Sequence, residues 1–123
     1  MYTFNVQKET DNCVYWIRDW FKKNAYNKKA IVGVSGGKDS TIVLALCVRA
    51  LGPKNVIGVM MPDKGQGLDH ADQICQYFGV KSYKCPIRRA TRAINRVVKK
   101  RVDDFTVQSE QNIPPRVRMT ILY

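Results

Sequence analysis

The sequence predicts an α/β fold with three layers, in which a parallel sheet carries helices on both faces. Two observations support this prediction. Runs of apolar and β-branched residues, which are typical of buried strands, alternate along the chain with longer segments of helical apolar periodicity. Glycine or proline marks several boundaries between these segments, as at Gly52-Pro53 and Gly79. This alternation indicates parallel strands that are joined by right-handed helical crossovers.

The first half of the chain is expected to contain two helices and one strand. Thr10 or Asp11 is a suitable N-cap for the first helix. The apolar positions of that helix are Val14, Ile17, Trp20 and Phe21. A polar connector, residues 24–29, leads to a strand over residues 30–34. A second helix follows residue 40 and ends before Gly52-Pro53.

The second half is expected to add two strands and three helices. Strands are predicted over residues 56–61 and 81–85, and helices over residues 69–78 and 88–101. Residues 103–112 are polar and are expected to form a loop. Pro114-Pro115 then opens a last helix over residues 116–123, because proline is tolerated in the first helical turn.

Length and composition indicate one soluble domain. The 123 residues allow a single modest core, and no apolar run approaches the length needed to cross a membrane. The N-terminus lacks the features of a signal peptide, so we expect a cytoplasmic protein. The four cysteines form no C-x-x-C pair and His70, in a polar loop, is the single histidine. We therefore expect reduced core cysteines and no thiolate metal site.

The basic residues are concentrated in one predicted helix. The chain has 21 Lys and Arg against 10 acidic residues, a net charge of +11, which points to anionic partners. Nine of the basic residues and no acidic one lie between residues 81 and 101. Arg88, Arg92, Arg96 and Lys100 repeat every four residues, opposite an apolar stripe of Ala90, Ile94, Val97 and Val98. We favour a solvated helix face over a patch for RNA phosphates.

Residues 35–40 carry the strongest functional signal. Their sequence is Ser-Gly-Gly-Lys-Asp-Ser, and they join a buried strand to the start of a helix. Backbone N–H groups and the helix dipole converge at such a turn on a phosphate-sized anion. The stretch fits neither the Walker A pattern nor the G-x-G-x-x-G fingerprint. An ordinary tight turn would not require this combination of residues, so we interpret the stretch as a phosphate loop.

Ligands of parallel sheets bind beyond the carboxyl ends of the strands. The phosphate loop follows the first predicted strand, and the loop after Met61 follows the second. Both loops are therefore expected on the same rim of the sheet. This rim is the candidate site.

Three stretches together resemble ammonia-dependent NAD synthetase, a branch of the N-type ATP pyrophosphatase superfamily. They are residues 33–40, which contain the Ser-Gly-Gly-x-Asp-Ser loop, residues 56–62, and residues 112–120 with their Asn-x-x-x-Arg-x-Arg-Met pattern. The loop is shared by the superfamily, and the last stretch narrows the resemblance to this branch. The resemblance implies a Rossmann-like fold of the adenine nucleotide alpha-hydrolase type.

The resemblance also implies a reaction. ATP adenylates the carboxylate of deamido-NAD (nicotinic acid adenine dinucleotide) and releases pyrophosphate, and ammonia then displaces AMP to give NAD. Asp39 is expected to hold Mg²⁺, and Asn112, Arg116 and Tyr123 to contact deamido-NAD. The expected ATP-binding residues are Gly33, Val34, Ser35, Gly36, Gly37, Lys38, Asp39, Ser40 and Met61.

Members of the resembled family are longer than this chain. Residues 1–123 are therefore expected to form one ATP-binding domain that lacks the C-terminal part of the family domain, and the family's homodimer is expected only for the full-length form. Free ammonia is the implied nitrogen donor, since no glutaminase segment precedes the phosphate loop. Two alternatives stay open: a tRNA-modifying ATP pyrophosphatase, which the basic helix favours, and a nucleotide-binding module without catalysis.

Overall fold

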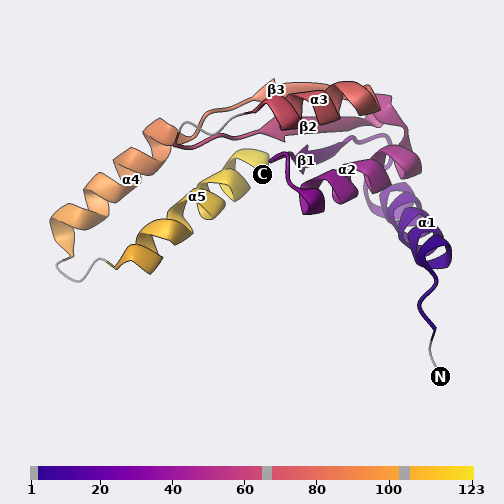
Figure 1. Ribbon diagram of the computed structural model, residues 1–123, viewed down its shortest axis with the longest axis horizontal. Coiled ribbons are helices and arrows are strands. Elements are labelled where there is room, and N and C mark those ends of the chain that lie inside the picture. The colour runs from indigo at the N-terminus through magenta and orange to yellow at the C-terminus, as the bar shows by residue number, and fades with distance from the viewer. Residues whose placement is uncertain (1–2, 65–67, 103–105) are drawn as a thin grey trace.

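The computed structural model of the chain describes residues 3–64, 68–102 and 106–123 (Figure 1). The elements, in chain order, are α1 (Val6–Asn24), β1 (Ala30–Gly33), α2 (Lys38–Leu51), the 3₁₀ turn η1 (Pro53–Asn55), β2 (Val56–Met60), α3 (Asp69–Phe78), β3 (Lys81–Lys84), α4 (Arg88–Arg101) and α5 (Val107–Leu122). The predicted strands and the helices at 69–78 and 88–101 agree with this order to within one residue at each end.

The three strands form one parallel sheet in the order β1-β2-β3. In the register of β1 with β2, Ala30 pairs with Val56, and in the register of β2 with β3, Ile57 pairs with Lys81. The structure confirms the α/β fold with a parallel sheet flanked by helices. It also places the ends of β1 and β2 side by side, as a shared rim requires.

Two clusters of buried side chains hold the sheet to the helices. The larger lies between the sheet and helices α2 and α3, and its members are Ala30, Val32, Val34, Leu44, Cys47, Val56, Met60, Ala71, Cys75 and Val80. The smaller consists of Val59, Met61, Ile87 and Val117. Because Val117 belongs to α5, this second cluster fastens the last helix to the rim of the sheet.

Helices α4 and α5 form a hairpin that extends away from the sheet, and only the C-terminal end of α5 returns to the strands (Figure 1). Thr91 is the one residue of α4 that is buried, and Val117 is the one buried residue of α5. The hairpin therefore contributes little to the main core.

The first helix begins earlier than predicted. Asn5, not Thr10 or Asp11, is the N-cap of α1, since its side-chain oxygen accepts a hydrogen bond from the Lys8 N–H at 3.0 Å. The predicted apolar face is only partly buried, because Val14 is buried while Trp20 is 43% exposed.

The last helix also begins earlier than predicted. Of the predicted loop at 103–112, residues 103–105 lie outside the described residues, and residues 107–112 are helical. Thr106 caps α5 through a hydrogen bond from the Ser109 N–H at 3.1 Å, so Pro114 and Pro115 lie inside the helix and do not open it. The prediction was wrong because a local cap and the packing of Val117 outweigh the proline signal.

The basic helix has its predicted bounds but a different buried face. Val97 is 64% exposed and Ile94 is 40% exposed, whereas Thr91 is 3% exposed. The apolar stripe is therefore largely exposed, and α4 turns a polar face toward α5.

The cysteine and histidine expectations need two corrections. Cys47 and Cys75 are buried free thiols, and Cys85 is half-buried, but Cys13 is exposed. His70 lies in the first turn of α3 and not in a loop. No helix in the described part of the chain is long and apolar enough to cross a membrane.

Candidate functional site

The phosphate loop connects the end of β1 to the start of α2. Val34 remains tied to the sheet, because it is 2% exposed and its N–H donates a hydrogen bond to the Val59 carbonyl at 2.9 Å. Gly36 then adopts a φ of +90°, a conformation that favours glycine. Gly37 has extended backbone angles and caps α2. The chain thus leaves the sheet and enters a helix within four residues.

Hydroxyl groups hold this loop closed. The Ser35 N–H donates to Ser40 Oγ at 3.2 Å, and the Gly37 N–H donates to Ser35 Oγ at 3.2 Å. The two serine oxygens lie 3.1 Å apart. The first N–H groups of α2 have no acceptor within the helix and carry the positive end of its dipole. The loop is therefore pre-organised to receive an anion.

The charged residues of the loop lie at its solvent side. The side chains of Lys38 and Asp39 form an ion pair at 2.9 Å, and each is 86% exposed. Such an exposed pair is weak, so a ligand can separate it at little cost. Among the described residues no group of three or more His, Cys, Asp or Glu side chains gathers to bind a metal. One carboxylate beside a phosphate loop still suits Mg²⁺, which commonly binds one or two carboxylates together with substrate phosphates.

The first turn of helix α3 packs against the loop at Gly36. A Cβ atom added at Gly36 would lie 3.2 Å from the His70 Cβ and 3.3 Å from the Ala71 backbone nitrogen. The loop therefore packs directly against the first turn of α3. This role of His70 was not predicted, because the contact joins residues that are distant in the sequence.

A cavity of about 780 Å³ opens beside the loop, between the ends of β1 and β2 and the C-terminal end of α5. Its lining brings together Gly33, Val34, Ser35, Met61, Pro62, Leu68, Pro115, Arg118, Met119, Leu122 and Tyr123. The structure thus gathers four of the expected ATP-binding residues with Tyr123. The volume suits a nucleotide-sized ligand.

Arg118 ties α5 to this cavity. Its Nε donates a hydrogen bond to the Met61 carbonyl oxygen at 3.0 Å, across 57 positions of sequence. Arg118 was not predicted to have a role of its own, although it lies two residues after Arg116. The two other residues expected to contact deamido-NAD, Asn112 and Arg116, are exposed on α5 and are not among the residues that line this cavity.

The family model described as NAD synthase matches residues 9–123. The NH3-dependent NAD(+) synthetase of Methanococcus aeolicus is 35% identical over 99 residues, which cover 78% of this chain and 39% of that protein. The glutamine-dependent NAD(+) synthetase of Aquifex aeolicus is 34% identical over 111 residues, which cover 87% of this chain and 19% of that protein.

A solved structure gives the same relationship. The NH3-dependent NAD synthetase from Campylobacter jejuni, determined in complex with the nitrate ion, superimposes with a TM-score of 0.83 and 29% identity. The match covers 98% of this chain and 52% of that one. The chain spans less than half the length of the two curated relatives. The family match over residues 9–123 shows that this chain belongs to the NAD synthase family.

Proposed function

We propose that this chain binds ATP and supports the ATP-dependent amidation of deamido-NAD by ammonia, with NAD, AMP and pyrophosphate as products. The observation that carries the proposal is the position of the phosphate loop, residues 35–40, at the edge of the cavity of about 780 Å³ in a chain of this family. The loop and the cavity together match the two parts of ATP, a chain of phosphates and an apolar base.

In this proposal the triphosphate lies on the loop. Backbone N–H groups of Gly36 and Lys38 and the hydroxyls of Ser35 and Ser40 donate to its oxygens, and the start of α2 adds its dipole. The Gly37 N–H leaves its hydrogen bond to Ser35 Oγ to join them. The adenosine occupies the cavity against Gly33, Val34 and Met61, where Met61 is 8% exposed and offers an apolar wall. Lys38 contributes general positive potential.

Asp39 is the residue we propose for Mg²⁺. Its carboxylate lies in the first turn of α2, one residue from the phosphate-binding N–H groups, and the donor set is the hard oxygen chemistry that this ion prefers. When bound there, Mg²⁺ would neutralise negative charge on the phosphate oxygens. Asp39 must first leave its ion pair with Lys38.

The proposed chemistry has two steps. A carboxylate oxygen of deamido-NAD attacks the α-phosphorus of ATP, and the bond to the β-phosphate oxygen breaks to release pyrophosphate. The loop N–H groups stabilise the charge that develops on this leaving group. The ammonia nitrogen then attacks the acyl carbon, AMP departs and a proton passes to solvent. Asn112, Arg116 and Tyr123 are proposed to contact deamido-NAD, and the second copy of a homodimer is proposed to complete its site in the full-length family form.

Free ammonia is the proposed donor because the Methanococcus aeolicus and Campylobacter jejuni relatives are named NH3-dependent. A glutamine-dependent relative matches at similar identity, so the donor needs its own test.

The experiment is product analysis after the chain is mixed with ATP, Mg²⁺ and deamido-NAD, with ammonium in one reaction and glutamine in another. We expect NAD and AMP in equal amounts with ammonium. Product formed only with glutamine would contradict the proposed donor. A chain that forms neither NAD nor AMP in either reaction would contradict the proposed activity for this chain.

A further inference from the structure

The two edges of the sheet differ in how they are protected against further pairing. Strands β1 and β3 are the outer strands, since the order is β1-β2-β3. Strand β3 begins with Lys81 and ends with Lys84, and both are exposed. Charged side chains of this kind discourage another strand from pairing with an edge. Strand β1 has the sequence Ala-Ile-Val-Gly, so it carries neither a charged residue nor a proline. The edge of β1 therefore lacks the protection that β3 has.

The backbone groups at the outer edge of β1 belong to Ile31 and Gly33. The Val34 N–H donates a hydrogen bond to the Val59 carbonyl oxygen at 2.9 Å, and the register places Gly33 beside Val59. In a parallel pair, alternate residues of a strand direct their backbone groups to the same neighbour. Val32 and Val34 therefore face β2, whereas Ile31 and Gly33 face away from it. In the described part of the chain no strand lies on that side.

A largely apolar groove runs along this edge. A cavity of about 630 Å³ lies between β1, the end of α1 and the first half of α2, and Phe21, Ile31 and Val43 are in its lining. A cavity of about 450 Å³ lies between α1 and α2, with Trp16 and Val43 in its lining. The two cavities adjoin at Val43. Because Ile31 is 52% exposed, Val43 48% and Trp16 64%, the groove is an uncovered apolar surface.

Helix α1 lies beside this groove and covers little of the sheet. It packs on α2, where the Arg18 Nε donates a hydrogen bond to the Ala50 carbonyl oxygen at 3.1 Å. Figure 1 shows α1 beyond α2, on the side of the molecule opposite β3. Val14 is the one residue of α1 that is buried. Helices that flank a parallel sheet normally cover its strands, so the position of α1 suits a sheet that continues past β1.

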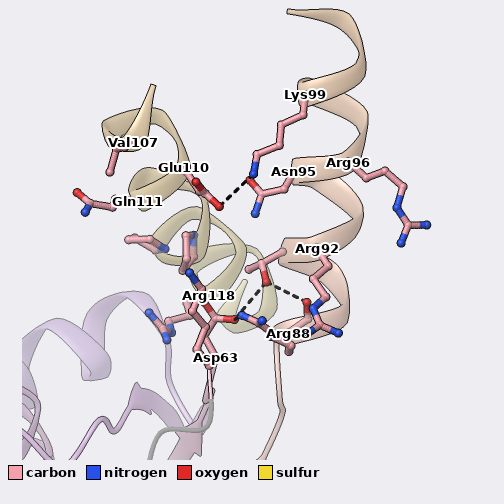
Figure 2. Close-up of a pocket in the computed structure, with 14 residues that line it drawn as sticks. Asp63, Arg88, Arg92, Asn95, Arg96, Lys99, Val107, Glu110, Gln111 and Arg118 are labelled. Atoms are coloured by element: carbon pink, nitrogen blue, oxygen red, sulfur yellow. Dashed lines mark hydrogen bonds and ion pairs between the residues drawn. The ribbon is translucent and has the colours of Figure 1, made fainter. Parts of the chain in front are cut away.

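The cavity between α4 and α5, of about 690 Å³, has walls of a different kind (Figure 2). Its polar side chains pair with one another: Thr91 Oγ1 donates a hydrogen bond to Asp63 at 3.2 Å, and Lys99 Nζ lies 3.4 Å from Glu110. The second of these contacts joins the two helices directly. The groove beside β1 instead leaves apolar side chains half exposed, so it is the stronger candidate for docking another segment.

We propose that the edge of β1 pairs with a further β-strand, which comes from the part of the NAD synthase domain that lies outside residues 1–123. This strand runs parallel to β1, because both existing strand pairs are parallel. Its backbone bonds to Ile31 and Gly33, and its apolar side chains cover Phe21 and Val43 beneath α1.

Length and charge support this occupant. The chain spans about half of the Campylobacter jejuni relative, so a segment long enough to extend the sheet lies outside it. The net charge of +11 favours a partner with a net negative charge. The proposal rests on the family and on this surface, and it does not depend on the proposed ATP site.

The probe is the part of the Campylobacter jejuni synthetase that has no counterpart in this chain, produced as a separate fragment together with the tagged chain. A complex with one copy of each should form, and sedimentation measures its affinity. In the chain alone, the amide N–H groups of Ile31 and Gly33 should exchange rapidly with deuterium, and complex formation should slow that exchange. The amides of Val32 and Val34 should be protected in both states.

A proline at each edge tests the pairing itself. Ile31→Pro removes an N–H that faces away from β2, and an edge strand tolerates proline at such a position. Ser82→Pro is the matched control at the other edge, because Cys85, three positions later, donates its N–H to the Met60 carbonyl oxygen and the Ser82 N–H faces outward. Ile31→Pro should weaken the complex by at least about tenfold, the size of one lost backbone hydrogen bond. Ser82→Pro should stay within about twofold.

A second pair of variants tests the groove without changing a strand. Val43→Lys places a charge where the added strand packs, and should weaken the complex by at least about tenfold. Ile42→Lys is the control, because Ile42 is 56% exposed on the same helix and lines neither cavity of the groove. Its loss should stay within about twofold.

Three results would overturn the proposal. The first is equal losses within both pairs of variants, and the second is no complex at high micromolar concentration. The third is a stable dimer of the chain alone that Ile31→Pro dissociates, because a second copy of the chain would then occupy the edge of β1.

Discussion

Gly36 shows how single residues build the phosphate loop. Its φ of +90° turns the chain from β1 toward α2, and the first turn of α3 occupies the space that a Cβ atom would need. Two separate requirements therefore select glycine at this position. The first is conformational, and the second is the close approach of the Ala71 backbone nitrogen at 3.3 Å.

Replacement of Gly36 by alanine tests both requirements. Gly79→Ala is the control, because Gly79 also has a positive φ, of 67°, but has open space where its Cβ would project. Each substitution should lower the free energy of unfolding by about 1–2 kcal/mol, because alanine is disfavoured in the left-handed backbone conformation. Gly36→Ala should lower the free energy of unfolding by about 1 kcal/mol more, since the backbone of Ala71 cannot move aside for the new methyl group. Urea unfolding measures both values, and equal losses would contradict the packing of α3 on the loop.

A substitution at Asp39 tests the proposed position of Mg²⁺. Asp39→Asn keeps the shape of the side chain and removes the charge that Mg²⁺ needs, while an exposed site should leave folding unaffected. We expect the gain in ATP affinity on adding Mg²⁺ to fall by about tenfold, as calorimetry can measure. Asp19→Asn, which removes a half-buried carboxylate that is paired with Lys23 on α1, should leave that gain intact. An unchanged gain in Asp39→Asn would place the metal elsewhere.

The cysteines give a prediction that depends on pH. Burial raises the pKa of the Cys47 and Cys75 thiols above the ordinary value of 9.0. The unfolded chain therefore loses these protons first. The stability linked to the neutral thiols is present below pH 9 and is lost as the pH rises toward the folded-state pKa.

At pH 8 an aromatic disulfide reagent should modify exposed Cys13 and reach Cys47 and Cys75 only after denaturant is added. Rapid reaction of all the thiols in the folded chain would contradict their burial.

At the scale of elements, α5 departs furthest from its predicted bounds. A pair of prolines signals a helix start, yet α5 runs from Val107 through Pro114 and Pro115 to Leu122. Each proline removes one hydrogen bond from the helix interior. The helix persists because Thr106 caps it and because Val117 and Arg118 fasten its far end to the rim of the sheet.

Pro114→Ala tests whether α5 really continues through the prolines. Alanine restores the missing N–H and should raise the free energy of unfolding by about 1–3 kcal/mol, which is visible as a higher melting temperature. Pro53→Ala is the control, because Pro53 occupies the first position of η1, where the N–H needs no partner. A melting temperature that falls in Pro114→Ala would support a helix that starts at the prolines.

The elements also show how far sequence reasoning reaches. The strands at 30–34 and 56–61 and the helix at 69–78 were predicted because apolar runs and the Gly79 cap are local signals. The turn between β1 and α2 was predicted for the same reason. The covered face of α4 could not be predicted from the residue pattern of α4 alone, because packing against α5 decides which side is covered. The contacts of Gly36 with His70 and of Arg118 with Met61 join distant segments and left no local pattern.

At the scale of the whole molecule, the chain consists of an α/β body and a projecting hairpin (Figure 1). The small cluster of Val59, Met61, Ile87 and Val117 joins them. The cavity beside the phosphate loop lies at this junction, with walls from the strand ends and from the end of α5. An ATP site at this position would therefore draw on both parts of the fold.

The most direct test of this account is an NMR titration of the ¹⁵N-labelled chain with ATP and Mg²⁺. Amide signals of Gly36 and Gly37 should shift together with those of Met61 and Leu122, because one nucleotide contacts the loop and the cavity at once. Loop signals that stay unchanged at millimolar ATP, or shifts confined to α4, would contradict it.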